Sequence, residues 1–178
     1  MRNAALSLSM LVVGLGACGD VGGSATVDAA AGMDAYDEAR CLIAGNYGAL
    51  GALTGTTSQG PATLTIVLDP GPPRDSFFIK LNAGKGAFAG GLTTGTFPLT
   101  GADAQSANCG VCVNIIADIV AMQGPSKFYF ATSGSVTLTS TQPPIGSVSN
   151  LSFVETGVNG DVMPGGCTAT IDSMSFSL

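Results

Sequence analysis

Hydrophobic and polar residues alternate with a period of two along much of the chain after residue 60. This pattern is typical of β-strands that bury one face. In the segment 111–119 aliphatic side chains occupy every second position, and Asn114 and Asp118 fall on the opposite face. Strands are also predicted over 62–68, 76–81, 92–99, 127–130, 135–139, 151–153 and 169–178.

Irregularities are expected at three places in or between these strands. Gly134 separates two strand patterns and indicates a bulge or bend. Pro98 cannot donate a backbone hydrogen bond, so its strand is expected at a sheet edge or to end there. The hydrophobic positions change parity between Ile171 and Met174, which predicts a bulge near Asp172.

The spacing of the strands indicates the fold class. They recur every eight to twelve residues or so with no helical pattern between them, as in antiparallel sandwiches and small barrels. Only the segment 36–43 has a pattern suited to one or two helical turns. We therefore predict a single all-β domain over residues 36–178, an antiparallel β-sandwich or small barrel.

The N-terminal segment has the features of an export signal. Arg2 precedes an apolar run over 4–14, which is shorter than the roughly 20 residues of a membrane-spanning helix. The run leads into Leu15-Gly16-Ala17-Cys18. This order of charge, apolar run, Leu, small residues and Cys resembles the lipobox of bacterial lipoproteins. The resemblance implies that residues 1–17 are a removed signal peptide and that Cys18 carries the lipid.

Two other interpretations of this segment remain: an ordinary signal peptide cut after Ala17, or an uncleaved anchor. By the resemblance, Gly19 rather than Asp after the lipidated cysteine implies sorting to the outer membrane. Two or more acyl chains hold a protein stably on a bilayer. Residues 18–35 are small or polar and lack aromatic side chains, and such a flexible tether has a reach of about 20–25 Å. The mature part is similar to uncharacterised putative lipoproteins of Gram-negative bacteria.

Composition narrows the choice of partners. The chain has 12 acidic and 6 basic residues, with a net charge of −6, and only 10% of its residues are charged. No basic stripe is present to contact phosphates, so nucleic acid is not expected as a partner. The 26 glycines suit an exported β-domain with many turns. The expected location is the cell envelope, facing the periplasm or the exterior.

The chain contains no histidine, which excludes Ser-His-Asp and Cys-His catalysis and histidine-ligated zinc. Paired carboxylates remain possible, but the two glutamates, Glu38 and Glu155, are interpreted as solvated surface charges. Lys85 lies between glycines without the spacing of a phosphate-binding loop, so we expect a turn. No catalytic residue and no cofactor is predicted.

Calcium and sugar binding are kept as alternatives. The loop 69–75 holds two carboxylates, and Asn159 and Asp161 flank a glycine in a turn signal. Calcium needs only oxygen ligands, but neither segment has a dense acidic series, so no metal site is predicted. Sugar platforms stack on exposed rings, and the chain has no Trp and only Tyr36, Tyr47 and Tyr129.

The four cysteines other than Cys18 are Cys41, Cys109, Cys112 and Cys167. An even number in an oxidising compartment indicates disulfides. A redox CxxC stands at a helix N-terminus, whereas Cys112 leads into a strand pattern, and a Cys₄ zinc site usually has two CxxC pairs. Of three possible pairings we favour Cys41 and Cys167 each bonded to one of the central pair, because residues three apart in a strand face opposite ways. Cys109 and Cys112 can join each other only if 108–110 is a turn.

The sequence therefore predicts a lipid-anchored, disulfide-stapled all-β domain. Its expected role is non-catalytic, either structural or in binding an unspecified protein or glycan. The alternatives are a calcium- or sugar-dependent adhesion module and an enzyme based on carboxylates or the CxxC pair.

Overall fold

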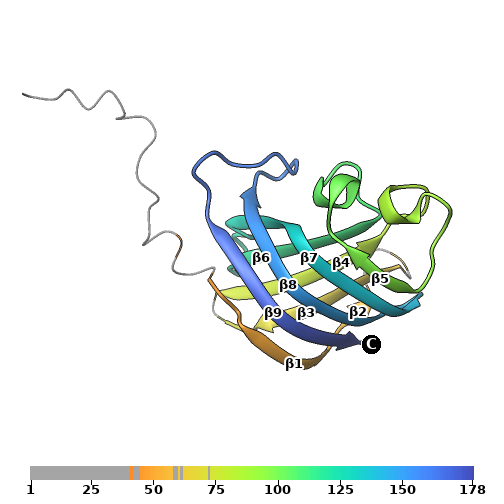
Figure 1. Cartoon of the computed structure of the whole chain (residues 1–178). Helices are drawn as coiled ribbons and strands as arrows, with labels where there is room; N and C mark the ends of the chain where they lie inside the picture. The colour runs from red at the N-terminus through yellow and green to blue at the C-terminus, as the bar shows by residue number, and fades with distance from the viewer. Residues whose placement is uncertain (1–40, 42–44, 58–59, 61, 72) are drawn as a thin grey trace, which may run out of the picture. The chain divides into compact units, whose positions relative to one another are not determined.

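The alternating segments form an all-β fold, as predicted (Figure 1). The computed structural model describes residues 41, 45–57, 60, 62–71 and 73–178, which all belong to one compact unit. The elements in chain order are β1 (Ala49–Thr54), β2 (Thr56–Thr57), β3 (Thr63–Asp69), β4 (Arg74–Leu81), the 3₁₀ helix η1 (Gly86–Phe88), β5 (Gly95–Pro98), the 3₁₀ helix η2 (Gly101–Ala104), β6 (Val111–Ile119), β7 (Lys127–Thr141), β8 (Pro144–Thr156) and β9 (Thr168–Ser177).

The strands form one sheet that curls into a nearly closed barrel. Their order is β1-β9-β8-β7-β6-β4-β3-β2, with β5 paired to β7. In Figure 1 the strands β9, β8 and β7 cross in front of β6, β4 and β3. β1 pairs in parallel with β9, and the other strand pairs are antiparallel.

The barrel closes at Gly55, where one piece of chain changes partner. The Gly55 N–H donates to the Ser177 carbonyl of β9 at 2.8 Å, and Thr56 then pairs with Thr65 of β3. A Cβ at Gly55 would lie 2.6 Å from the Thr65 carbonyl oxygen. Only a residue without a side chain allows the two edges to approach this closely.

The interior is filled by large apolar side chains from every second strand position. On β4, Phe77 and Ile79 are fully buried, while Phe78 and Lys80 face outward. The Phe77 ring lies 6.5 Å from that of Phe176 on β9. Each such side chain contributes about 1.5–3 kcal/mol when fully buried, so this core is the main source of stability.

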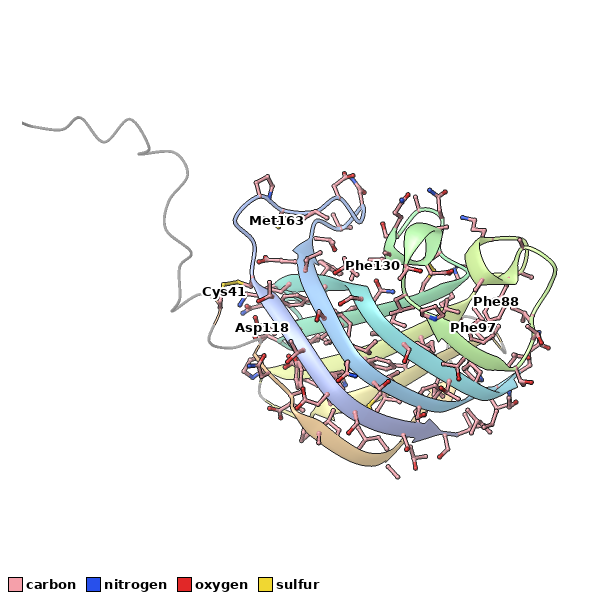
Figure 2. The ribbon with its side chains drawn as sticks, viewed as in Figure 1. Cys41, Phe88, Phe97, Asp118, Phe130 and Met163 are labelled. Carbon is pink, nitrogen blue, oxygen red and sulfur yellow. A yellow bond between two sulfur atoms is a disulfide. The ribbon has the colours of Figure 1, made fainter. Side chains whose placement is uncertain are left out.

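The segment between β4 and β6 adds to this core. Phe88 of η1 packs edge-on against Phe97 of β5, with ring centroids 4.9 Å apart (Figure 2). β5 ends at Pro98 and pairs with β7 alone, which confirms the position expected from the proline.

The bend predicted at Gly134 is confirmed. The two patterns on either side of Gly134 belong to one long strand, β7, whose register with β8 shifts between Ala131 and Ser133 and again between Ser133 and Ser135, across Gly134. Gly134 has a φ of +105°, and a Cβ there would lie 2.5 Å from the Asn150 carbonyl oxygen.

The bulge predicted near Asp172 is wrong. The register between β9 and β8 has no shift, because β8 changes face at the same level, where Asn150 has a φ of +51°. The extra residue lies in β1 instead, between Ala49 and Ala52.

Several predictions fall on other parts of the chain. The signal segment 1–17, the tether 18–35 and the helical turn over 36–43, apart from Cys41, lie outside the described residues.

Candidate functional site

A buried polar network lies at the end of the barrel where β4 begins and β6 ends. The Tyr47 hydroxyl donates to Asp75 Oδ2 at 2.7 Å, and the Asp118 backbone N–H donates to Asp75 Oδ1 at 2.9 Å. Asp118 has a φ of +54°, and the register between β4 and β6 shifts beside it. This bulge turns the Asp118 N–H toward Asp75, so both oxygens of the buried Asp75 carboxylate are engaged.

Asp118 also forms a buried ion pair with the first residue of β7. Its Oδ2 lies 3.3 Å from Lys127 Nζ and accepts a hydrogen bond from Ser126 Oγ at 3.2 Å. Its Oδ1 has no hydrogen-bond partner among the described residues. Both members of the pair are less than a tenth exposed. A buried pair of this kind costs desolvation energy, and loss of one partner leaves an uncompensated charge.

The network holds Tyr47 in its neutral form. Burial is the main cause that raises the pKa of Tyr47 well above its ordinary value, and the hydrogen bond to Asp75 raises it further. Tyr129 is 1% exposed. Tyr129 therefore offers no free ring for a sugar to stack upon, whereas Tyr47 is partly exposed.

The interpretation of Glu155 as a solvated surface charge is wrong. Glu155 is 2% exposed, and its Oε2 accepts a hydrogen bond from the Cys167 backbone N–H at 2.8 Å. Glu155 lies near the end of β8, and its backbone N–H donates to the Cys167 carbonyl at 2.9 Å, so it lies beside the segment that leads into β9. The other glutamate, Glu38, lies outside the described residues.

The four cysteines are paired, but not as favoured from the sequence. Cys41 bonds Cys167 with a Cα–Cα distance of 5.4 Å, and Cys109 bonds Cys112 with a Cα–Cα distance of 5.2 Å. The favoured pairing is wrong because β6 begins only at Val111. Cys109 therefore precedes the strand and is free to turn back.

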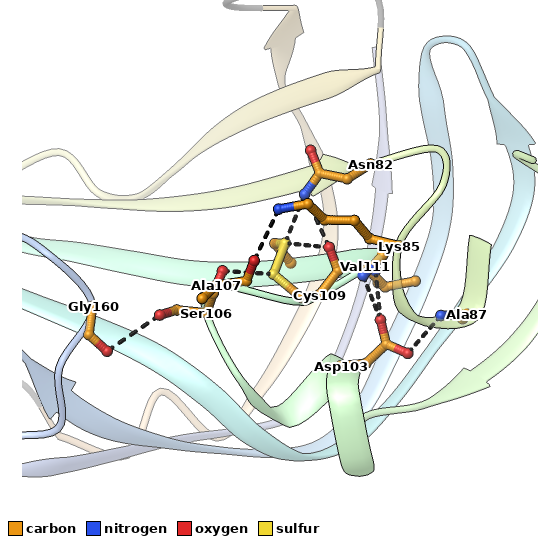
Figure 3. The surroundings of a disulfide bond; sticks show 11 residues. Asn82, Lys85, Ala87, Asp103, Ser106, Ala107, Cys109, Val111 and Gly160 are labelled. Carbon is orange, nitrogen blue, oxygen red and sulfur yellow. Dashed lines mark hydrogen bonds between the residues drawn. A yellow bond between two sulfur atoms is a disulfide. The ribbon is translucent and has the colours of Figure 1, made fainter. Parts of the chain in front are cut away.

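Asp103 of η2 produces that turn (Figure 3). Its Oδ1 accepts hydrogen bonds from the backbone N–H groups of Gly110 at 2.7 Å and Val111 at 2.9 Å, and its Oδ2 accepts one from Ala87 at 2.8 Å. A Cβ at Gly110 would lie 2.4 Å from the Lys85 carbonyl oxygen. Asp103 thus joins η1, η2 and the start of β6. No sequence motif identified it, because its three donors come from two distant segments.

The CxxC disulfide is packed into this structure and is shielded from solvent. Cys109 is 1% and Cys112 6% exposed, and both cluster with Phe130. The Asn82 side-chain N–H₂ donates to the Cys109 carbonyl and contacts Cys112 Sγ, both at 3.0 Å. Lys85 lies in the expected turn and donates from Nζ to the Ala107 carbonyl at 2.8 Å.

The two segments considered for calcium do not gather ligands. Asp69 Oδ1 accepts a hydrogen bond from the Gly71 N–H, and Asp75 points into the barrel-end network. Asp161 accepts the Gly157 N–H on its backbone carbonyl. Within the described part of the chain, no three carboxylates or thiols come together as a metal site.

An open groove of about 210 Å³ lies on the outer face of β4, β6 and β7. Phe78 lies opposite Asn114 on the neighbouring strand, and Ile116 lies opposite Phe128. These half-buried side chains surround Asn114, and Lys80 is the only charged residue among the described residues that line the groove. Within the described part, the side chains of Lys80 and Asn114 make no hydrogen bond or ion pair.

Comparison of the chain with models of protein families, with curated proteins and with solved structures finds no match. In the part of the chain that is described, no helix is both long and apolar enough to cross a membrane.

Proposed function

We propose that this protein is a lipid-anchored domain of the cell envelope with a non-catalytic binding role. Cys18 carries the lipid and anchors the domain to the outer membrane, facing the periplasm or the exterior. The groove on the outer face binds a small anionic ligand that has an apolar ring.

The groove is the observation that carries this proposal. Phe78, Ile116 and Phe128 give it apolar walls. Asn114 and Lys80 add a donor, an acceptor and a positive charge that the described fold does not use. Ligand sites generally combine mostly apolar walls with a few such polar groups.

The acidic residues support a non-catalytic role. A general acid or base must reach a substrate atom, whereas the oxygens of Asp75 and Asp103 accept hydrogen bonds from the protein itself. Both side chains are about 5% exposed. Their contacts hold turns and strand ends in place.

The groove is tested with anilinonaphthalene sulfonate, an anionic dye with apolar rings. Ile116→Thr and Lys80→Gln are expected to weaken binding of the dye several-fold. Val67→Thr is the matched control, because Val67 is exposed on the same face but does not line the groove. Equal dye binding by all four proteins, each with an unchanged circular dichroism spectrum, would contradict a groove site.

The anchor is tested separately. Cys18→Ala is expected to leave the protein unprocessed or to release it from membranes, while the wild-type protein fractionates with membranes and carries an acyl mass. A soluble wild-type protein without that mass would contradict the proposed location.

A further inference from the structure

The exposed hydrophobic side chains of the barrel are concentrated in two loops. Among the described residues seven large hydrophobic side chains are exposed, and five of them lie between β6 and β7 or between β8 and β9. These five are Val120, Met122, Val158, Val162 and Met163. Met122 is fully exposed, and Val158 is 80% exposed. We call these five residues the apolar rim.

Both loops connect strands at the same end of the barrel. Phe128 at the start of β7 pairs with Thr156 at the end of β8, so the two loops begin on neighbouring strands. The disulfide from Cys41 to Cys167 places Cys41 at this end too, close to the loop that carries Met163 (Figure 2). Cys41, the first described residue, therefore lies at the end of the barrel that carries the apolar rim.

Backbone hydrogen bonds hold the longer loop open. Gly157 donates to the Asp161 carbonyl at 2.8 Å, and Met163 donates to the Glu155 carbonyl at 3.0 Å. Ser106 Oγ donates to the Gly160 carbonyl at 3.2 Å. With its backbone bonds satisfied in this way, the loop presents Val158 to solvent instead of folding it into the core.

We propose that the apolar rim inserts into the surface of a lipid bilayer, so that the barrel stands with this end on the membrane. The inference rests on the proposed lipid anchor in one respect. If the 22 residues between Cys18 and Cys41 form the tether expected from their composition, they reach about 25 Å, which would keep this end near the bilayer.

The charges at this end do not favour lipid of one sign. Arg74 at the start of β4 is exposed opposite Ile119, and Asp161 is an exposed acid within the longer loop. Lys127 beside the shorter loop is paired with Asp118. Exposed apolar patches mark sites of contact with membranes or other proteins, and the rim gathers five exposed apolar side chains in two loops at one end of the barrel. Insertion is therefore expected in neutral phosphatidylcholine and should not require anionic lipid.

The absence of tryptophan from the chain provides a direct test. Met122→Trp and Val158→Trp each introduce a single fluorophore into the rim, and Leu178→Trp is the control at the opposite end. Leu178 is also exposed, at 57%. The full-length processed proteins are reconstituted into phosphatidylcholine vesicles with brominated acyl chains. Fluorescence at 122 and 158 should fall about twofold or more, as for a side chain within the acyl boundary, while that at 178 should not change.

The outcomes separate this inference from the proposed anchor. Mass spectrometry of the same samples shows whether Cys18 is acylated. Acylated protein whose rim fluorescence is unquenched would overturn the inference and leave the anchor intact. Quenching of the rim positions in protein that proves to lack the lipid would support the rim and contradict the anchor. A blue shift without quenching, growing with protein concentration, would show that a second copy covers the rim and would also overturn the inference.

Discussion

Tyr47 donates its phenolic hydrogen to Asp75 Oδ2 at 2.7 Å, and this bond joins the segment before β1 to the start of β4. The two residues are 28 positions apart, and β1, which follows Tyr47, is not a neighbour of β4 in the sheet. The bond therefore fastens the entering chain to the barrel independently of the strand pairing.

Tyr47→Phe is expected to destabilise the protein by about 1 kcal/mol at pH 7. The variant leaves Asp75 Oδ2 without its donor, and the partial exposure of Tyr47 keeps the loss small because solvent screens the contact. Urea unfolding measures the difference. An unchanged midpoint would contradict the structural role of this bond.

The same residue predicts a pH dependence. The pKa of Tyr47 is higher in the folded protein than its ordinary value, so the folded state keeps a proton that the unfolded chain loses above about pH 10. The contribution of protonated Tyr47 to the free energy of unfolding is therefore complete below about pH 10. It decreases as the pH rises further, by at most about 1.4 kcal/mol per pH unit. Tyr47→Phe should show a weaker decrease than the wild-type protein between pH 9 and about pH 11.5. If the free energy of unfolding falls equally with pH in the wild-type protein and in Tyr47→Phe, Tyr47 does not titrate in this way.

Asp103→Ala should be among the most damaging single substitutions. It leaves the buried N–H groups of Gly110 and Val111 without an acceptor, at about 1–3 kcal/mol for each, and also removes the acceptor of the part-buried Ala87 N–H. Asp172→Asn is the control, because Asp172 is exposed and such changes usually stay within about 0.5 kcal/mol. Thermal unfolding of both variants gives the comparison. Similar melting temperatures would mean that Asp103 does not organise this region.

The closure of the barrel is tested by two glycines in one stretch of chain. Gly55→Ala places a Cβ against the Thr65 carbonyl and should cost about 1–3 kcal/mol, as overpacking does. Gly51→Ala meets no atom within 4 Å and should be neutral or stabilise by up to about 1 kcal/mol. Equal stabilities would show that the edges at Gly55 are not in close contact.

Native protein should not react with a thiol reagent until it is both unfolded and reduced. Removal of the Cys41–Cys167 bond should cost more than removal of Cys109–Cys112, because the sequence separations are 126 and 3 residues. The loop-entropy model gives about 5 and about 2 kcal/mol. Paired Cys→Ser variants and chemical unfolding measure both losses. Exchange of the Cys109–Cys112 bond with glutathione in the native state would favour a redox role instead.

Local sequence patterns predicted most of the strands, because period-two alternation records which face of a strand is buried. The segment 111–119 coincides with β6, and Pro98 and Gly134 mark the irregularities expected of them. β1 was missed because its sequence ALGALT consists mainly of small residues and has little hydrophobic alternation.

The features missed from the sequence depend on distant partners. Glu155 is buried because the Cys167 N–H meets it, and Asp118 because Lys127 and Ser126 lie beside it. The cysteine pairing depended on a turn that Asp103 forms from outside the CxxC segment. A local sequence pattern does not reveal such contacts. The groove could not be predicted either, because its walls come from three neighbouring strands.

The Cys41–Cys167 bond determines how the barrel carries a mechanical load. Tension applied to the chain ahead of Cys41 passes through the disulfide directly to the start of β9, as well as along the backbone into β1. β1 and β9 are parallel neighbours that begin at the same end, so the pull acts on both together. Without the bond, the same force would act on β1 alone and could strip it from the sheet one hydrogen bond at a time. A single covalent link thus shares the pull between β1 and β9 and keeps it from acting on their pairing.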